Sequence, residues 1–189
     1  GAGAVGLGSA VRLLREGARI VAISDIEHTV FLREDLEEPE LIALVKQGRL
    51  QTEGRAVRGV GPREQLFTEE VDALVLAASS HSLDSALAES LVADCLVEGS
   101  NFGLTPAARE VWALRGRVIV PDVTASSASA AMVAHQLHAR GCAAPADLWA
   151  DIEACIRREV RDGLQHWRRS GESLRARSFR QAGVEQQKR

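Results

Sequence analysis

Residues 1–25 are GAGAVGLGSAVRLLREGARIVAISD, a glycine-rich turn followed by a predicted helix and a predicted strand. The helix is expected over residues 9–16, where apolar and polar side chains recur with helical spacing, and Gly17 is expected to end it as a C-cap. Residues 19–24 form a short apolar run rich in β-branched side chains, which is typical of a buried strand in a parallel sheet. This run stops at Asp25.

The turn has the spacing Gly1-x-Gly3-x-x-Gly6. In a dinucleotide-binding fold the first glycine makes the tight turn, the second lets a pyrophosphate approach the backbone, and the third lets the helix pack closely on the sheet. The helix N-terminus adds free N–H groups and partial positive charge. Asp25 follows Gly6 by 19 positions, where a carboxylate can accept hydrogen bonds from the adenosine ribose. These features predict a dinucleotide site; the alternative is a glycine-rich turn beside a surface aspartate.

The acidic side chain of Asp25 favours NAD over NADP, because a 2′-phosphate would meet a like charge. Arg33 lies a few residues further on and could reach such a phosphate, so NADP is not excluded. The same fold requires a central strand before the glycine turn, and a sheet without it would leave buried backbone groups unpaired. We therefore expect the natural protein to contain a strand that precedes Gly1.

Predicted helices and strands alternate along most of the chain, which favours an α/β fold with a Rossmann-type, doubly wound parallel sheet and C-terminal helices. Residues 1–140 are expected to form the dinucleotide-binding domain, with its first strand and an upstream domain missing from this chain, and residues 141–189 a C-terminal helical extension. Further strands are expected at residues 55–60 (weakly), 71–77, 95–97 and 117–120. Helices are expected at residues 37–47, 83–91, 105–114, 127–139, 145–170 and 174–182, and a helical turn at 62–66.

Composition excludes several classes of protein. The chain has 189 residues, of which 46% are hydrophobic, and a net charge of -3, so one domain is expected and neither nucleic acid nor a membrane surface is an expected partner. No apolar run approaches the ~20 residues of a membrane span. Cysteines 95, 142 and 155 are odd in number and lack CxxC spacing, which favours reduced thiols in a cytoplasmic protein. His135 and His138 lie three apart on a predicted helix but lack an evident third metal ligand.

Several stretches resemble one family, the dehydrogenases of glutamate, leucine, phenylalanine and valine. Residues 1–25 are similar to the family's glycine turn, helix and second strand, and the resemblance continues in the same order through most of the chain. The further similar stretches are VDALVLAAS at 71–79, LVEGSNFGLTPAA at 96–108, RGRVIVPDV at 115–123 and SLRARSFRQAG at 173–183. Malic enzymes share the glycine turn but lack the Val-Glu-Gly-x-Asn and Val-Pro-Asp pair.

The resemblance implies an enzyme that oxidises an L-amino acid to a 2-oxo acid by hydride transfer to NAD. It places the catalytic lysine and aspartate in a preceding domain, so no catalytic residue is expected in this chain, and it implies that the full-length protein is a homo-oligomer. Asn101 is expected near the nicotinamide ribose, although a turn asparagine bonded to its own backbone is the alternative. The predicted cofactor-binding residues are Gly1, Gly3, Ala4, Val5, Gly6, Asp25, Ile26, Ala77, Ala78, Ser79, Asn101 and Ser126.

Two segments depart from the family pattern. Residues 126–130 are SSASA, where the family has Asn-Ala-Gly-Gly-Val beside the nicotinamide, so a hydroxyl replaces an amide and both glycines are lost. If those glycines adopt positive φ, Ala128 and Ser129 would cost about 1 kcal/mol or more each. The second segment is residues 79–81, which lack the usual asparagine; His81 there is expected to be an exposed loop residue rather than a cofactor contact. These departures leave open an alternative function, a catalytically inactive NAD-binding relative with a regulatory or structural role.

Overall fold

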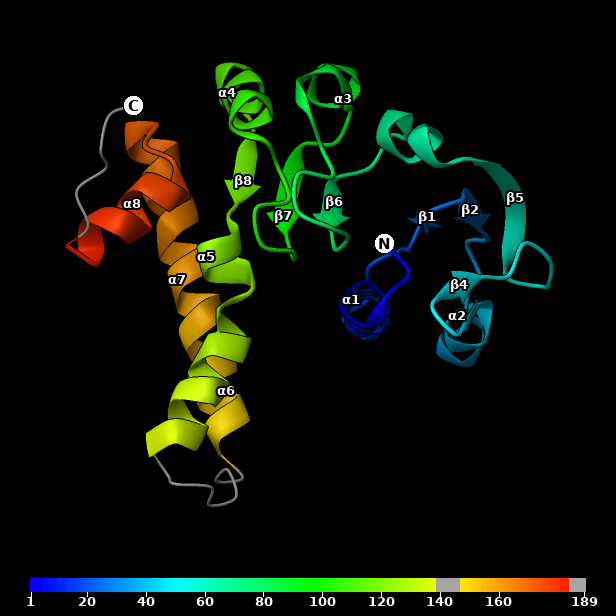
Figure 1. Cartoon of the computed structure of the whole chain (residues 1–189), viewed down its shortest axis with the longest axis horizontal. Helices are drawn as coiled ribbons and strands as arrows, with labels where there is room; N and C mark the ends of the chain where they lie inside the picture. The colour runs from blue at the N-terminus through cyan, green and yellow to red at the C-terminus, as the bar shows by residue number, and fades with distance from the viewer. Residues whose placement is uncertain (139–146, 184–189) are drawn as a thin grey trace.

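The computed structural model describes residues 1–138 and 147–183, and Figure 1 shows the course of the chain. The N-terminal part contains α1 (Ala4–Arg15), β1 (Ala22–Ser24), β2 (His28–Leu32), α2 (Glu38–Leu44), β3 (Val45–Lys46), β4 (Arg49–Leu50), β5 (Val57–Pro62) and the 3₁₀ helix η1 (Arg63–Thr68). The central part contains β6 (Ala73–Leu76), α3 (Ser85–Ser90), β7 (Cys95–Glu98), α4 (Pro106–Leu114) and β8 (Val118–Val120). The C-terminal part contains α5 (Asp122–Ala125), α6 (Ser127–His138), α7 (Leu148–Ser170) and α8 (Leu174–Gln181).

The central part is a three-stranded parallel sheet in the order β6-β7-β8, as expected for an α/β fold. Helices α3 and α4 pack side by side against it, and the core they share includes Leu76, Leu96 and the fully buried Trp112. Helix α4 begins where the sequence predicts, because Thr105 caps it by accepting a hydrogen bond from the N–H of Ala108 at 3.1 Å.

Strand β1 corrects one expectation. Residues 19–24 were expected to form a parallel strand, but β1 covers only Ala22–Ser24 and pairs antiparallel with β2, which in turn pairs antiparallel with β5. Strand β2 was not predicted, although Thr29–Leu32 is a run of strand-forming residues that becomes entirely buried. The weakly expected strand at 55–60 is confirmed as β5, and the helical turn at 62–66 as η1.

A cavity of about 830 Å³ lies between β1 and β6. Strand β1 pairs with β2 and β6 pairs with β7, so within the described residues each has one edge without a neighbouring strand. Residues 20–24 and 71–75 line the cavity between these two edges. Two hydrophobic clusters therefore form separately, one around β2 and α2 and one around β6 to β8. The fold class predicts that the strand preceding the glycine turn occupies this position between β1 and β6.

The C-terminal helices leave the sheet after β8. Helices α6 and α7 lie side by side, and Figure 1 shows them extending away from the parallel sheet before α7 returns towards it. The helix predicted at 127–139 is confirmed as α6, and the short helix α5 before it was not predicted. Gly171, with φ of 73°, ends α7 and lets the chain turn into α8. Cys142 and the predicted domain boundary at residues 140–141 lie outside the described residues.

Candidate functional site

The glycine turn packs against the end of β6. A Cβ atom added at Gly6 would lie 1.7 Å from the carbonyl oxygen of Gly1, and one added at Gly1 would lie 2.6 Å from the carbonyl oxygen of Ala77. Both distances are far below van der Waals contact, so only glycine permits the turn to close on itself and on β6. The structure thus brings together two predicted site segments, residues 1–6 and residues 77–79.

Gly3 differs from its neighbours because a Cβ atom there would meet nothing within 4 Å. It is the N-cap of α1, and the helix begins with the hydrogen bond from the N–H of Leu7 to the carbonyl oxygen of Gly3 at 2.9 Å. The preceding N–H groups of the first turn have no partner inside the helix and point beyond its N-terminus. Gly3, Ala4 and Val5 are exposed, so the turn has the open backbone and the donors that a pyrophosphate requires.

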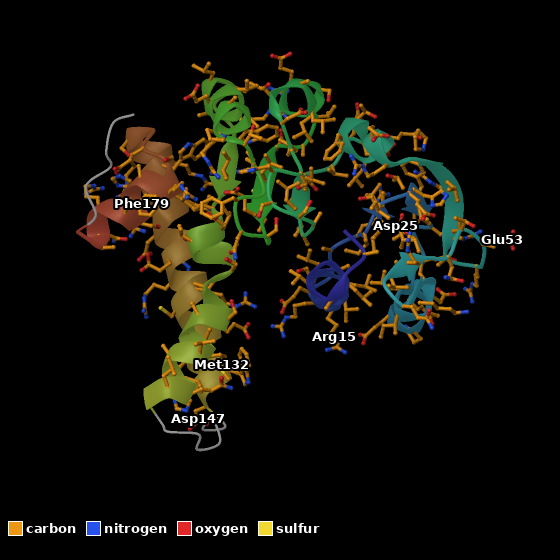
Figure 2. The ribbon with its side chains drawn as sticks, viewed as in Figure 1. Arg15, Asp25, Glu53, Met132, Asp147 and Phe179 are labelled. Atoms are coloured by element: carbon orange, nitrogen blue, oxygen red, sulfur yellow. The ribbon has the colours of Figure 1, made fainter. Side chains whose placement is uncertain are left out.

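Asp25 lies just beyond the end of β1, in the part of the molecule formed by α1, β1 and β2 (Figure 2). Its Oδ1 atom accepts hydrogen bonds from the N–H groups of Glu27 and His28 at 2.8 and 2.9 Å, and its Oδ2 atom accepts one from Leu50 at 2.9 Å. Its side chain is only 5% exposed. The carboxylate therefore anchors the β1–β2 turn, and one acceptor position on Oδ2 remains for a ribose hydroxyl. Ile26, beside it, is exposed.

The pKa of Asp25 lies below its ordinary value. Burial by itself raises this pKa, but the N–H groups of Leu50, His28 and Glu27 and the nearby charge of His28 together outweigh the burial. Asp25 consequently stays ionised at neutral pH and maintains a negative charge at the end of β1.

Asn101 follows the end of β7 and is held by two serines. The hydroxyl of Ser126 donates to its side-chain oxygen Oδ1 at 3.2 Å, and the hydroxyl of Ser80 donates to its backbone carbonyl at 2.8 Å. Ser126 comes from the C-cap of α5 and Ser80 from the loop after β6. The structure therefore joins the loops after β6, β7 and β8 around the exposed Asn101. Ser79 and Ala78 are exposed at the same edge.

A buried charge network beneath Asn101 was missed by the sequence reasoning. Glu98, which is 0% exposed, forms an ion pair with Arg109 at 2.8 Å and accepts hydrogen bonds from the N–H groups of Leu104 and Asp122 at 3.1 and 3.4 Å. Asp122 in turn accepts a hydrogen bond from the N–H of Phe102 at 2.9 Å. The two carboxylates thus hold the Asn101 loop from both sides. A glutamate at the end of an apolar strand, as in 95–98, was the available signal.

Asp122 also pairs with Arg175 of α8. Burial by itself raises the pKa of Asp122, but the N–H of Phe102 and the charge and hydrogen bond of Arg175 outweigh it, so the pKa lies below its ordinary value. The unfolded chain therefore binds more protons than the folded chain, and Asp122 stabilises the fold at pH values above about 4, the ordinary pKa of an aspartate. This stabilisation is lost as the pH falls from there through the lower, folded pKa.

The substitution Asp122→Asn is expected to make stability less dependent on pH below about 4. It removes one titrating group, so the slope of the unfolding free energy against pH should fall by at most about 1.4 kcal/mol per pH unit. Urea unfolding followed by circular dichroism between pH 2.5 and 6 measures the slope of the unfolding free energy against pH for the variant and for the unmodified chain. Asp151→Asn, at an exposed position of α7, is the control. Identical slopes for Asp122→Asn and the unmodified chain would contradict the prediction.

The divergent segment 126–130 forms regular structure. Ser126 is the C-cap of α5 and residues 127–130 begin α6, and neither Ala128 nor Ser129 has positive φ. The strain that would follow from positive φ at these two residues is therefore absent.

His81 is exposed, as expected, and has a positive φ of 55°, with its N–H donating to the carbonyl of Phe102 at 2.7 Å.

Other kinds of site find no support within residues 1–138 and 147–183. In this part of the chain no three histidine, cysteine or acidic residues gather in a way that could hold a metal ion. None of its helices combines the length and the apolar character needed to cross a membrane. Cys95 and Cys155 are free thiols, and burial, followed by the charge of Asp94, raises the pKa of Cys95.

Comparisons with known proteins agree with this geometry. The family model described as Glutamate/Leucine/Phenylalanine/Valine dehydrogenase matches residues 1–181. An NADP-specific glutamate dehydrogenase A1 and an NAD-specific glutamate dehydrogenase A, both from Halobacterium salinarum, are each 34% identical to this chain, over 133 and 131 residues. Each match covers 67% of this chain, but only 30% and 29% of the two relatives, so the chain spans less than a third of their length.

A solved structure is also similar. The hetero-hexameric glutamate dehydrogenase from Thermus thermophilus, in a leucine-bound form, superposes with a TM-score of 0.73 at 28% identity. The superposition covers 93% of this chain and 42% of that one. The expected Rossmann-type fold is thereby confirmed. From its glycine turn to α8, this chain belongs to the glutamate/leucine/phenylalanine/valine dehydrogenase family.

Proposed function

We propose that this chain binds the nicotinamide dinucleotide of an amino-acid dehydrogenase. The observation that carries the proposal is the glycine turn, in which Gly1 and Gly6 are closed by backbone contacts while Gly3 stays open at the N-terminus of α1. The pyrophosphate would accept hydrogen bonds from the N–H groups of residues 3–6. The nicotinamide half would extend along the ends of β6 and β7 towards Asn101, which the two serine hydroxyls orient.

The preferred cofactor is NAD. The Asp25 carboxylate is ionised, nearly buried and tied to three backbone N–H groups, so it cannot rotate away from a ligand without leaving those donors unpaired. A 2′-phosphate on the adenosine ribose would approach this fixed charge, whereas a ribose hydroxyl could donate to its free acceptor position. The relatives include proteins named NAD-specific and NADP-specific, so the family alone does not decide between the two cofactors.

The whole protein would oxidise an L-amino acid to an imine, which water would hydrolyse to a 2-oxo acid and ammonia. When bound, the nicotinamide ring would accept the hydride from the α-carbon of the amino acid. The residues of this chain bind and orient the cofactor, and the groups that transfer protons would come from a part of the protein beyond it. We also propose that residues 1–140 form the cofactor-binding domain, that residues 141–189 extend it, and that the whole protein is a homo-oligomer.

Titration with NADH and NADPH, followed by nucleotide fluorescence, tests the proposal. The unmodified chain is expected to bind NADH more tightly than NADPH, and Asp25→Asn is expected to reduce this preference about tenfold because the repelling charge is removed. Asparagine keeps one acceptor for the turn. Asp151→Asn, at an exposed carboxylate of α7, is the control and should leave the preference unchanged. Absence of NADH binding to the unmodified chain would refute the proposed function.

A further inference from the structure

The loop that carries Asn101 has an unfavourable backbone conformation. Phe102 has φ of 52°, in the left-handed region that non-glycine residues rarely adopt, and its ring is exposed. Two hydrogen bonds hold it there: its N–H donates to Oδ2 of Asp122 at 2.9 Å, and its carbonyl accepts from the N–H of His81 at 2.7 Å. Because Asn101 precedes Phe102, these bonds also determine where the Asn101 amide lies.

Asp122 depends on Arg175 for its position. Its Oδ1 atom accepts from the N–H of Val123 at 2.9 Å and from the guanidinium of Arg175, which leaves Oδ2 directed at Phe102. The side chains of Asp122 and Arg175 are 6% and 19% exposed, so water competes little with this ion pair. The same guanidinium lies over the Phe102 ring, 5.9 Å from its centroid, and over the Phe179 ring at 5.1 Å. Figure 2 shows Phe179 on α8.

The backbone of α8 is itself held firmly against α7. Leu174, which is buried, packs beside Gly163 of α7, where an added Cβ would lie 2.9 Å from the Leu174 side chain. Glu172, before α8, contacts His166 of α7 at 2.6 Å. Arg175 therefore projects from a helix whose position is set by α7, and 53 residues separate it in sequence from Asp122.

We propose that Arg175 is a positioning residue for the nicotinamide end of the cofactor site, acting through Asp122 and Phe102 to place the Asn101 amide. The inference rests on the proposed cofactor function. It assigns α8 to the cofactor site although α8 lies far from the glycine turn in sequence. Any displacement of α7 and α8 relative to the parallel sheet would be transmitted to Asn101 through this ion pair, because the same guanidinium contacts both Asp122 and Phe102.

Separate titrations with NADH and with ADP test this inference. ADP contains the pyrophosphate and the adenosine ribose but lacks the nicotinamide ribose and the nicotinamide ring. Arg175→Met is expected to weaken NADH binding about tenfold and to leave ADP binding nearly unchanged, because the glycine turn is intact. Asp122→Asn should give a similar loss, and the double variant no further loss, since the two residues act as one unit. Arg180→Met, on an exposed position of the same helix, is the matched control and should bind both ligands normally.

The outcomes separate this inference from the proposed function. If the unmodified chain binds neither ligand, the proposed function fails. If it binds both, but Arg175→Met leaves NADH affinity unchanged or weakens both ligands equally, the positioning inference is overturned. Should Arg175→Met not fold, Arg175→Lys decides the question, because lysine keeps the charge beside Asp122 without the planar group over Phe102. A smaller, NADH-specific loss in Arg175→Lys supports the inference, and unchanged NADH affinity in that variant overturns it.

Discussion

Gly6→Ala is expected to weaken NADH binding about 100-fold or more, which corresponds to roughly 3 kcal/mol of binding free energy. The new methyl group would lie 1.7 Å from the carbonyl oxygen of Gly1, and this obstacle is backbone rather than a flexible side chain. The turn must open, and the N–H groups of residues 3–6 then no longer converge on a pyrophosphate. Overpacking of this kind also destabilises the fold, typically by about 1–3 kcal/mol. Fluorescence titration and thermal unfolding measure the two effects.

Gly8 supplies the matched control, and Gly3 separates cofactor binding from stability. A Cβ atom at Gly8 would meet nothing within 4 Å, and Gly8 lies inside α1, so Gly8→Ala should stabilise the helix by about 0.5–1 kcal/mol and leave NADH binding unchanged. Gly3 is equally open but lies where the pyrophosphate is expected, so Gly3→Ala should weaken NADH binding without loss of stability. If Gly6→Ala, Gly3→Ala and Gly8→Ala all bound NADH as tightly as the unmodified chain, the glycine turn would not hold the cofactor.

Glu98→Gln is expected to lower the free energy of unfolding by about 3 kcal/mol, the cost typical of breaking a buried ion pair by removing one charge. Glu98 is fully buried, and its carboxylate accepts from the guanidinium of Arg109 and from the N–H groups of Leu104 and Asp122. Glutamine has nearly the same shape but only one acceptor oxygen, so at least one of these donors loses its partner. Chemical denaturation followed by circular dichroism measures the loss.

The same substitution tests whether Glu98 supports the cofactor site. Because Leu104 and Asp122 flank the Asn101 loop, NADH binding should weaken in Glu98→Gln even under conditions where the variant remains folded. Glu110→Gln, at an exposed position of α4, is expected to change stability by less than about 0.5 kcal/mol. A loss of stability in Glu98→Gln as small as in this control would mean that the buried pair contributes little.

Local signals in the sequence predicted most of the elements correctly. Thr105 and Pro106 begin α4, and Gly17 and Gly116 adopt positive φ of 86° and 64° after α1 and α4, because capping and left-handed backbone depend on residues close in sequence. The glycine spacing likewise identified the turn. A Cβ atom at Gly6 would clash with Gly1, a few residues away, and one at Gly1 would clash with Ala77 after the adjacent strand β6.

Strand pairing and charge networks required the tertiary structure. The apolar run ending at Ser24 is compatible with parallel or antiparallel pairing, and its antiparallel partner β2 was not predicted. Asp25 is predicted from the sequence as a ribose ligand, and the structure adds a structural function, because the N–H of Leu50 in β4 donates a hydrogen bond to its carboxylate. No local pattern in the sequence predicts the ion pair between Asp122 and Arg175. It forms because α7 returns towards the parallel sheet and places α8 beside Asp122.

The amino-acid sequence by itself determined the fold class, the glycine turn and the family resemblance, because these depend on steric and hydrophobic patterns that repeat over a few residues. The tertiary structure alone decided how the loops after β6, β7 and β8 meet around Asn101 and which carboxylates support them. Those contacts join residues far apart in the chain, and their energies depend on burial, which makes an ion pair such as Glu98–Arg109 strong only once solvent is excluded.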